Sequence, residues 1–158
     1  MSLDDWVKIA TIIGGVATAL TGAATVAVLW YTVRITRFSK QSDVLLQCTE
    51  RFSRVWEMRA NPQVVADPIV FYERFWSLQL DQFTHWKNGF IDAGVFDTWM
   101  KGRYREWQDN EPFGNMKYRD GYEKVIATWE TPKFKSFMLE LHNHGPEAAY
   151  KWWKANRD

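Results

Sequence analysis

Histidine and carboxylate side chains are the groups of this chain that could carry out acid–base chemistry. Asp81 and His85 are four residues apart, a spacing that places two side chains on one face of a helix. A carboxylate that orients a histidine can serve general acid–base catalysis, but it can equally be a polar contact on a helical bundle. No nucleophile or third partner accompanies the pair. We therefore predict a non-enzymatic protein and keep an enzyme or sensor that uses Asp81 and His85 as an alternative.

A second polar group lies near the C-terminus. His142 and His144 flank Asn143 close to Glu140. A metal site would need further ligands, and no Cys–His or Glu-x-x-His pattern supplies them. A polar helix end, where histidine interacts favourably with the helix dipole, explains these residues better. With no glycine-rich phosphate loop either, we predict neither a metal nor a cofactor.

The charge is nearly balanced over the 158 residues, with a formal net value of +1. The first forty residues carry four basic and two acidic side chains, and the remainder carries 16 basic and 17 acidic ones. Nucleic-acid binding usually requires a basic face, so we predict that nucleic acid is not a partner. Cys48 is the only cysteine, which excludes an internal disulfide and is more typical of a small buried side chain than of a reactive thiol.

The element that would position everything else is an uncharged stretch, Ile9–Val33. A helix needs about 20 apolar residues to cross a bilayer, so the stretch is long enough. A cleaved signal peptide would begin with basic residues and end at a small-residue cleavage site. Here Asp4 and Asp5 precede the stretch, and Leu29, Trp30 and Tyr31 extend it. We therefore predict a retained transmembrane helix over 9–33, after a short extracytoplasmic N-terminus at 1–8.

Aromatic and basic residues mark the two ends of the predicted span. Trp6 and the Trp30–Tyr31 pair are separated by about 36 Å along a helix, as two aromatic belts would be. Arg34, Arg37 and Lys40 follow directly, and basic residues favour the cytoplasmic side. Trp6, Trp30, Tyr31, Arg34 and Arg37 are the predicted membrane-interface anchors. They place the C-terminal part in the cytoplasm and the chain in a bacterial inner membrane.

Small residues form two rows along the span. Gly15, Ala19, Ala23 and Ala27 recur every four residues, and Gly14, Thr18 and Gly22 form a second row beside them. Such rows allow close approach of another helix, since packing drives helix association in lipid. The alternative is a generic span that contains alanine and threonine by chance. We predict a helix-packing interface at these seven residues.

The rest of the chain predicts helices. The first helix can continue through a juxtamembrane extension at 34–60 to Asn61-Pro62, with Leu45, Cys48, Phe52, Val55 and Trp56 as one apolar stripe. A domain at 61–158 follows. Its predicted helices are 68–88, apolar over most of its circumference, 93–108, 119–130, one from Pro132 and one from Pro146, with a loop at 109–117. We find no convincing strand, so the predicted fold is all-α: a transmembrane helix that continues into a small cytoplasmic helical bundle.

Three segments carry a family resemblance: VLWYTVRITR at 28–37, DPIVFYERFWSLQLDQFTHWKNGFID at 67–92 and TPKFKSFM at 131–138. In these the chain resembles a broad group of uncharacterised bacterial proteins. In that group a single N-terminal span leads through a basic juxtamembrane helix into a small cytoplasmic helical domain. The resemblance implies a fold and a location and adds no activity.

The expected function follows from the architecture. We predict a membrane-anchored accessory or scaffold subunit that docks on a larger membrane complex through its span and its aromatic-rich helical domain. The expected partners are transmembrane helices of that complex or copies of the chain itself, together with the lipid bilayer. A homo-oligomeric membrane scaffold is the main alternative.

Overall fold

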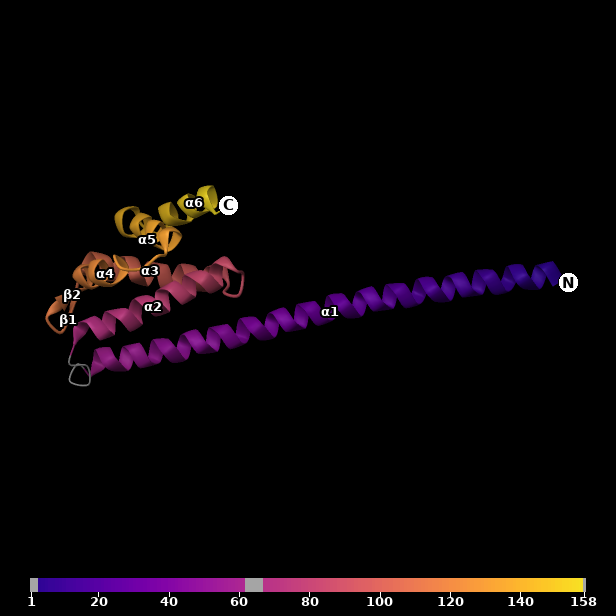
Figure 1. The fold of residues 1–158 in the computed structure, drawn as a ribbon, viewed down its shortest axis with the longest axis horizontal. Helices are drawn as coiled ribbons and strands as arrows, with labels where there is room; N and C mark the ends of the chain where they lie inside the picture. The colour runs from indigo at the N-terminus through magenta and orange to yellow at the C-terminus, as the bar shows by residue number, and fades with distance from the viewer. Residues whose placement is uncertain (1–2, 62–66, 158) are drawn as a thin grey trace. The chain divides into compact units, whose positions relative to one another are not determined.

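Helices account for most of the described residues, which in this computed structural model are 3–61 and 67–157. Within residues 3–19, only Asp4, Lys8, Thr11, Gly15 and Thr18 are described beyond the backbone. The elements in chain order are α1 (Leu3–Ala60), α2 (Pro68–Lys87), α3 (Ala93–Asp109), β1 (Pro112–Phe113), β2 (Met116–Lys117), α4 (Tyr118–Ile126), α5 (Pro132–His144) and α6 (Pro146–Asn156) (Figure 1). The predicted all-α class is confirmed.

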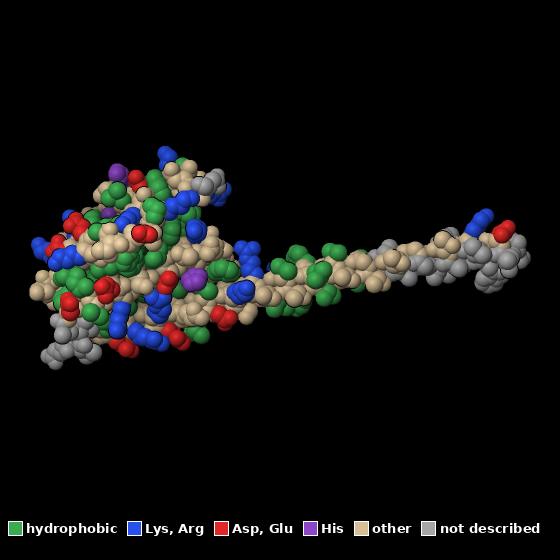
Figure 2. Space-filling model, in the orientation of Figure 1, with side chains coloured by type: hydrophobic (Ala, Val, Ile, Leu, Met, Phe, Trp, Pro, Cys, Tyr) green, Lys and Arg blue, Asp and Glu red, His purple; other side chains and the backbone are tan. Residues whose placement is uncertain are grey.

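The chain divides into two units, Met1–Lys40 and Gln41–Asp158, and α1 contributes to both. In the first unit the described large apolar side chains are exposed. Figure 2 shows apolar side chains along this part of α1. The second unit contains the aromatic core.

None of the helices in the part of the chain that the structure describes is both long enough and apolar enough to cross a membrane. The predicted span 9–33 includes several positions whose side chains lie outside the described residues: Ile9, Ala10, Ile12, Ile13, Gly14, Val16, Ala17 and Ala19. The transmembrane helix stays a prediction.

The continuity of α1 follows from its composition. Gly and Pro are the residues that most strongly interrupt helices, and neither occurs from Ala23 to Ala60. The helix ends at Ala60, immediately before Asn61-Pro62, as predicted.

The start of α2 also follows a local rule. The Asp67 carboxylate accepts a hydrogen bond from the Ile69 backbone N–H at 2.9 Å, and Pro68 occupies the first helical position. This cap satisfies one of the backbone donors that a helix leaves free at its start. In agreement with its apolar circumference, α2 is buried at eight residues: Phe71, Tyr72, Phe75, Trp76, Leu78, Gln79, Gln82 and Phe83.

Within residues 41–158, α2 lies between the end of α1 on one side and α3 and α4 on the other, and α5 and α6 lie beyond α3 (Figure 1). The 41–60 part of α1 runs antiparallel to α2, since Gln41 bonds to Gly89 while Met58 contacts Arg74. Aromatic rings fill the space between the helices. Trp86 stacks on Phe96 at 4.4 Å, and Phe83 packs edge-on against Trp153 at 5.1 Å.

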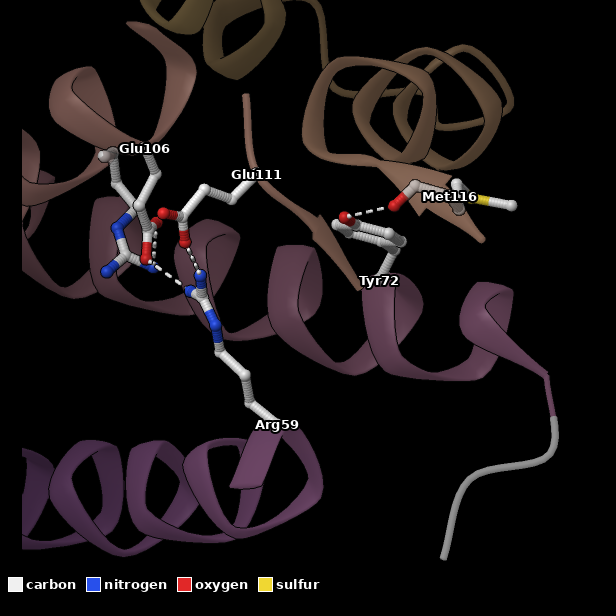
Figure 3. Close-up of polar contacts among 6 residues, drawn as sticks. Arg59, Tyr72, Glu106, Glu111 and Met116 are labelled. Atoms are coloured by element: carbon white, nitrogen blue, oxygen red, sulfur yellow. Dashed lines mark hydrogen bonds and ion pairs between the residues drawn. The ribbon is translucent and has the colours of Figure 1, made fainter. Parts of the chain in front are cut away.

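A short β-hairpin occupies part of the predicted loop at 109–117, so the expectation of no strand is wrong here. Phe113 pairs with Met116 and Pro112 with Lys117. Gly114 turns the hairpin with φ of +60°, a backbone conformation that glycine adopts at little cost. The two-residue strands are too short to show an alternating pattern. The Tyr72 hydroxyl of α2 donates to the Met116 carbonyl at 3.1 Å and ties the hairpin to the core (Figure 3).

One predicted helix boundary needs correction. The helix predicted over 119–130 ends at Ile126, and the Thr128 hydroxyl donates to the Val125 carbonyl in the turn that follows. The helix predicted from Pro132 does begin there, but Thr131 makes no capping hydrogen bond.

Candidate interaction surface

Residues 41–60 of α1 present three sectors around the helix, because each residue advances by about 100°. The first sector is buried against the bundle and contains Cys48, Val55 and Met58. A second, exposed sector lies beside it and has no charge. The third carries the charged residues Asp43, Glu50, Arg54 and Glu57. The predicted single apolar stripe is therefore split, since Cys48 and Val55 are buried while Leu45 and Trp56 are exposed.

The exposed uncharged sector is centred on four residues, Leu45, Thr49, Phe52 and Trp56, which we name the α1 seam. Leu45 is 41% exposed, Phe52 38% and Trp56 52%. The rings of Phe52 and Trp56 stack at 5.9 Å. On its outer side the seam borders Leu46 and Ser53, which are exposed and uncharged. Over the rest of residues 41–158, Figure 2 shows basic and acidic side chains interspersed on the visible face.

Three sets of polar contacts hold the seam in place on the bundle. Gln41 donates to the Gly89 carbonyl at 3.0 Å, and Arg51 pairs with Asp81 of α2. At the last turn Arg59 reaches Glu106 of α3 at 3.1 Å and Glu111 at 3.2 Å (Figure 3). The Arg59 guanidinium also lies 5.4 Å from the centroid of the Trp56 ring. The 41–60 part of α1, which carries the seam, is thus attached to the bundle at both of its ends and in its middle.

An arginine-lined groove of about 670 Å³ lies between α1 and α2. Arg51, Arg54 and Arg74 line it with Glu73, Ser77 and Trp129. Its positive charge could attract an anion, but two of the arginines, Arg51 and Arg74, already connect α1 to α2. Arg51 pairs with Asp81 and donates to Ser77, and Arg74 donates to the Met58 sulfur at 3.7 Å. The groove is best explained as the polar edge of the α1–α2 packing.

The predicted helix-packing residues that the structure describes are all exposed. They are Gly15, Thr18, Gly22, Ala23 and Ala27. A Cβ atom built on Gly15 or on Gly22 meets no atom within 4 Å, so added bulk there is tolerated by this chain itself. Gly14 and Ala19, the other two predicted packing residues, lie outside the residues whose side chains are described.

The predicted membrane-interface anchors Trp30, Tyr31, Arg34 and Arg37 are exposed, and Trp6 lies outside the described side chains. The Arg34 guanidinium lies 5.3 Å from the centroid of the Trp30 ring. This one-turn pair combines an aromatic ring with a cation, as residues at a membrane–water interface often do.

The structure does not join the predicted acid–base pair. Asp81 accepts a hydrogen bond from Arg51, and in residues 67–157 no hydrogen bond or ion pair connects Asp81 to His85. The His85 ring instead packs edge-on against Phe90 at 6.4 Å. The ion-pair partner of Asp81 is thus Arg51 of α1.

His142 is the residue that sequence reasoning placed least well. It lies in the last turn of α5, as predicted, but it is buried, with an exposed fraction of 2%. Its ring stacks on Trp107 at 3.8 Å with planes 3° apart, and Tyr122 packs edge-on at 4.9 Å. Burial, aided by the nearby Arg119 cation, lowers the pKa of His142 to about 3, so the ring is neutral at pH 7. Neither ring nitrogen has a hydrogen-bond partner among the described residues, so the ring acts as an aromatic core residue.

The remaining candidates for metal chemistry are also dispersed. The Nδ1 atom of His144 lies 3.9 Å from a carboxylate oxygen of Glu140. His144 is exposed, whereas His142 is buried. Among the described residues there is no group of three or more possible ligands that could hold a metal ion. Burial, with the charge of Asp81, raises the pKa of the Cys48 thiol, so Cys48 is a poor nucleophile.

Comparisons with known proteins return no match: no protein-family model, no curated protein and no solved structure is similar to this chain. The function must therefore be inferred from the surfaces that the structure presents.

Proposed function

We propose that this chain is a non-enzymatic, single-span membrane-anchored subunit that docks on a larger membrane complex. The observation that carries the proposal is the exposure of apolar side chains on α1. From Leu20 to Phe38, nine large apolar side chains are between 49% and 70% exposed. Apolar surface of this extent is unfavourable in water, and a bilayer or partner helices would cover it.

The sequence supports a lipid bilayer as the environment of this exposed apolar surface. The uncharged stretch Ile9–Val33 has the length of a span and is followed by Arg34 and Arg37. Basic residues on that side favour a cytoplasmic location for residues 34–158 at a bacterial inner membrane, with the N-terminus outside. The small residues Gly15, Ala19, Ala23 and Ala27 would then let another transmembrane helix approach closely.

The test begins with the location of the full chain. We expect it to remain in bacterial membranes after an alkaline carbonate wash, which removes peripheral proteins. After extraction in a mild detergent, the particle should have a mass well above that of one 18.7 kDa chain. A chain that leaves the membrane in the wash would overturn the anchor, and a monomer in mild detergent would overturn the docking.

A matched pair of variants tests the small-residue face. Gly15→Ile with Ala19→Ile adds bulk on that face, and we expect the chain to stay in the membrane but to leave the larger particle. Ala24→Ile adds bulk on the opposite side of the helix from Gly15 and Ala19 and should have no such effect. Equal release by both variants would show that bulk alone matters.

A homo-oligomeric scaffold is the second candidate, and the α1 seam favours it. The seam offers an uncharged, partly aromatic helix face outside the proposed lipid-facing stretch. Its outer neighbours Leu46 and Ser53 are uncharged, and Arg59 at its end is already paired with Glu106 and Glu111.

A further inference from the structure

We propose that the α1 seam pairs with the seam of a second copy of this chain, as a parallel and in-register two-stranded coiled coil. The parallel orientation rests on the proposed function, because membrane anchors would align two copies in the same direction. The pairing itself is argued from the spacing, the charge and the exposure of the seam.

The spacing of the seam is that of a coiled coil. Leu45, Thr49, Phe52 and Trp56 are separated by four, three and four residues. A regular alternation of four and three averages about 3.5 residues, which keeps one helix face directed at a partner helix. In the sequence, uncharged residues continue the alternation backwards at Ser42, Phe38, Ile35, Tyr31 and Val28. Arg59, the next position after Trp56, ends it with a charge.

The charges around the seam indicate that the partner is an identical copy. In a parallel pair of identical helices each residue faces its own counterpart, so charges near the seam would be placed against like charges and destabilise the pair. The neighbouring positions on the exposed side are Leu46 and Ser53, and those on the bundle side are Gln41, Cys48 and Val55, of which Cys48 and Val55 are buried. None is charged. A foreign coiled-coil partner is usually selected by opposite charges at these positions, and this chain offers none there.

Exposure and rigidity make the pairing favourable. Phe52 and Trp56 present a stacked aromatic surface, and Leu45 and Leu46 extend it. Covering these side chains removes apolar area from water. The contacts at Gln41, Arg51 and Arg59 already order the helix, so pairing costs little additional conformational entropy. A seam of about three turns is short, and a shared membrane would raise the effective concentration of the two copies.

Disulfide cross-linking of the full chain in membranes tests the proposal directly. In a Cys48→Ala background, Ser42→Cys and Thr49→Cys each introduce one cysteine on the seam line, seven residues apart. Glu57→Cys and Arg54→Cys introduce one on the charged sector. A parallel, in-register pair predicts cross-linked dimer at both seam positions, in at least tenfold greater yield than at either control position.

The alternative results are equally specific. A dimer that forms only between Ser42→Cys and Thr49→Cys chains, and not between identical chains, would overturn the parallel register. Equal yields at all four positions would overturn the seam. The membrane fraction of the same samples is measured in parallel. Seam cross-links in a chain that is not membrane-bound would overturn the anchor and leave the pairing intact, whereas a membrane-bound chain without them would overturn the pairing alone.

A pair of oppositely charged substitutions at Leu45 tests the pairing in chains whose bundle remains folded. Leu45 is partly exposed, so Leu45→Lys and Leu45→Glu should each leave the bundle folded, as judged by circular dichroism. Each variant alone places like charges opposite one another and should reduce the Thr49→Cys cross-link at least tenfold. Co-expression of the two should restore it, because the opposite charges then face each other. Leu139→Lys, at an exposed leucine of α5, is the control and should leave the cross-link unchanged.

Discussion

Two helices of this protein are rich in large apolar residues, yet they have opposite environments. In α2, Trp76 is completely buried and packs edge-on against Phe75, Tyr118 and Tyr122. In α1, Trp56 has a similar aromatic neighbour in Phe52 but is half exposed. The difference lies in the number of elements that surround each helix. Apolar side chains are therefore expected to be buried from water, but the tertiary arrangement decides whether other parts of the same chain bury them.

The largest expected effect compares these two tryptophans. Trp76→Ala removes a fully enclosed ring and should lower the free energy of unfolding by about 3–5 kcal/mol. Trp56→Ala should lower it by less than about 1 kcal/mol, since much of that ring is already in solvent. Denaturant unfolding of both variants of the full chain, followed by circular dichroism, measures the difference. Similar losses would show that the 41–60 part of α1 belongs to the core as fully as α2.

The next effect concerns pH and the buried His142. The pKa of His142 is about 3 in the folded protein, against about 6.5 when unfolded, so only the unfolded chain binds the proton between these values. Because of His142, the free energy of unfolding should decrease as the pH drops below 6.5, by about 1.4 kcal/mol per pH unit.

The matched variant for this effect is His142→Phe. Phenylalanine retains a ring that can stack on Trp107, and it has no titrating nitrogen. Midpoints of denaturant unfolding at pH 6.5 and pH 4.5 should differ less in the variant than in the original chain, while the carboxylate contributions remain in both. An unchanged pH dependence would mean that the histidine ring is accessible to solvent.

A smaller effect probes how closely the helices around α2 approach it. A Cβ atom on Gly121 of α4 would lie 2.4 Å from the Tyr72 ring, so Gly121→Ala should destabilise the fold by about 1–3 kcal/mol. On Gly102 of α3 a Cβ atom meets nothing within 4 Å, and Gly102→Ala should stabilise the helix by about 0.5–1 kcal/mol. The opposite signs can be read from thermal unfolding midpoints. Destabilisation by both would argue against open space beside Gly102.

The smallest effect asks what attaches the 41–60 part of α1 to α2. The Arg51–Asp81 pair is about 40% exposed, and exposed ion pairs contribute little, so Arg51→Met should change stability by less than about 1 kcal/mol. Val55→Ala, in the buried sector of the same helix, should cost about 1–3 kcal/mol through lost packing. Unfolding free energies of the two variants give the ranking. The reverse ranking would make the ion pair the principal attachment.

Local sequence rules predicted the helices of this protein well. Asp67-Pro68 marks the start of α2, and the absence of glycine and proline allows α1 to continue to Ala60. These features depend on residues near one another in the chain. The hairpin at Pro112–Lys117 escaped prediction because each strand has only two residues.

The tertiary structure alone decided which candidate residues meet. Asp81 and His85 share a helix, but Asp81 pairs with Arg51, which is thirty residues away along the chain. His142 occupies a helix end rich in polar residues, yet three aromatic residues from different helices enclose it: Trp107, Tyr122 and Trp76. Spacing within one helix cannot reveal partners that another helix supplies.

By itself, the sequence determined the helical class, most helix boundaries and the presence of an uncharged apolar stretch, because helix formation and capping depend on neighbours within a few residues. Only the tertiary structure decided how the apolar stripe of residues 45–56 divides. Cys48 and Val55 face the bundle, whereas Leu45 and Trp56 remain exposed. That division depends on where α2 packs against α1. It leaves part of the predicted apolar stripe exposed, where we propose that a second copy of the chain binds.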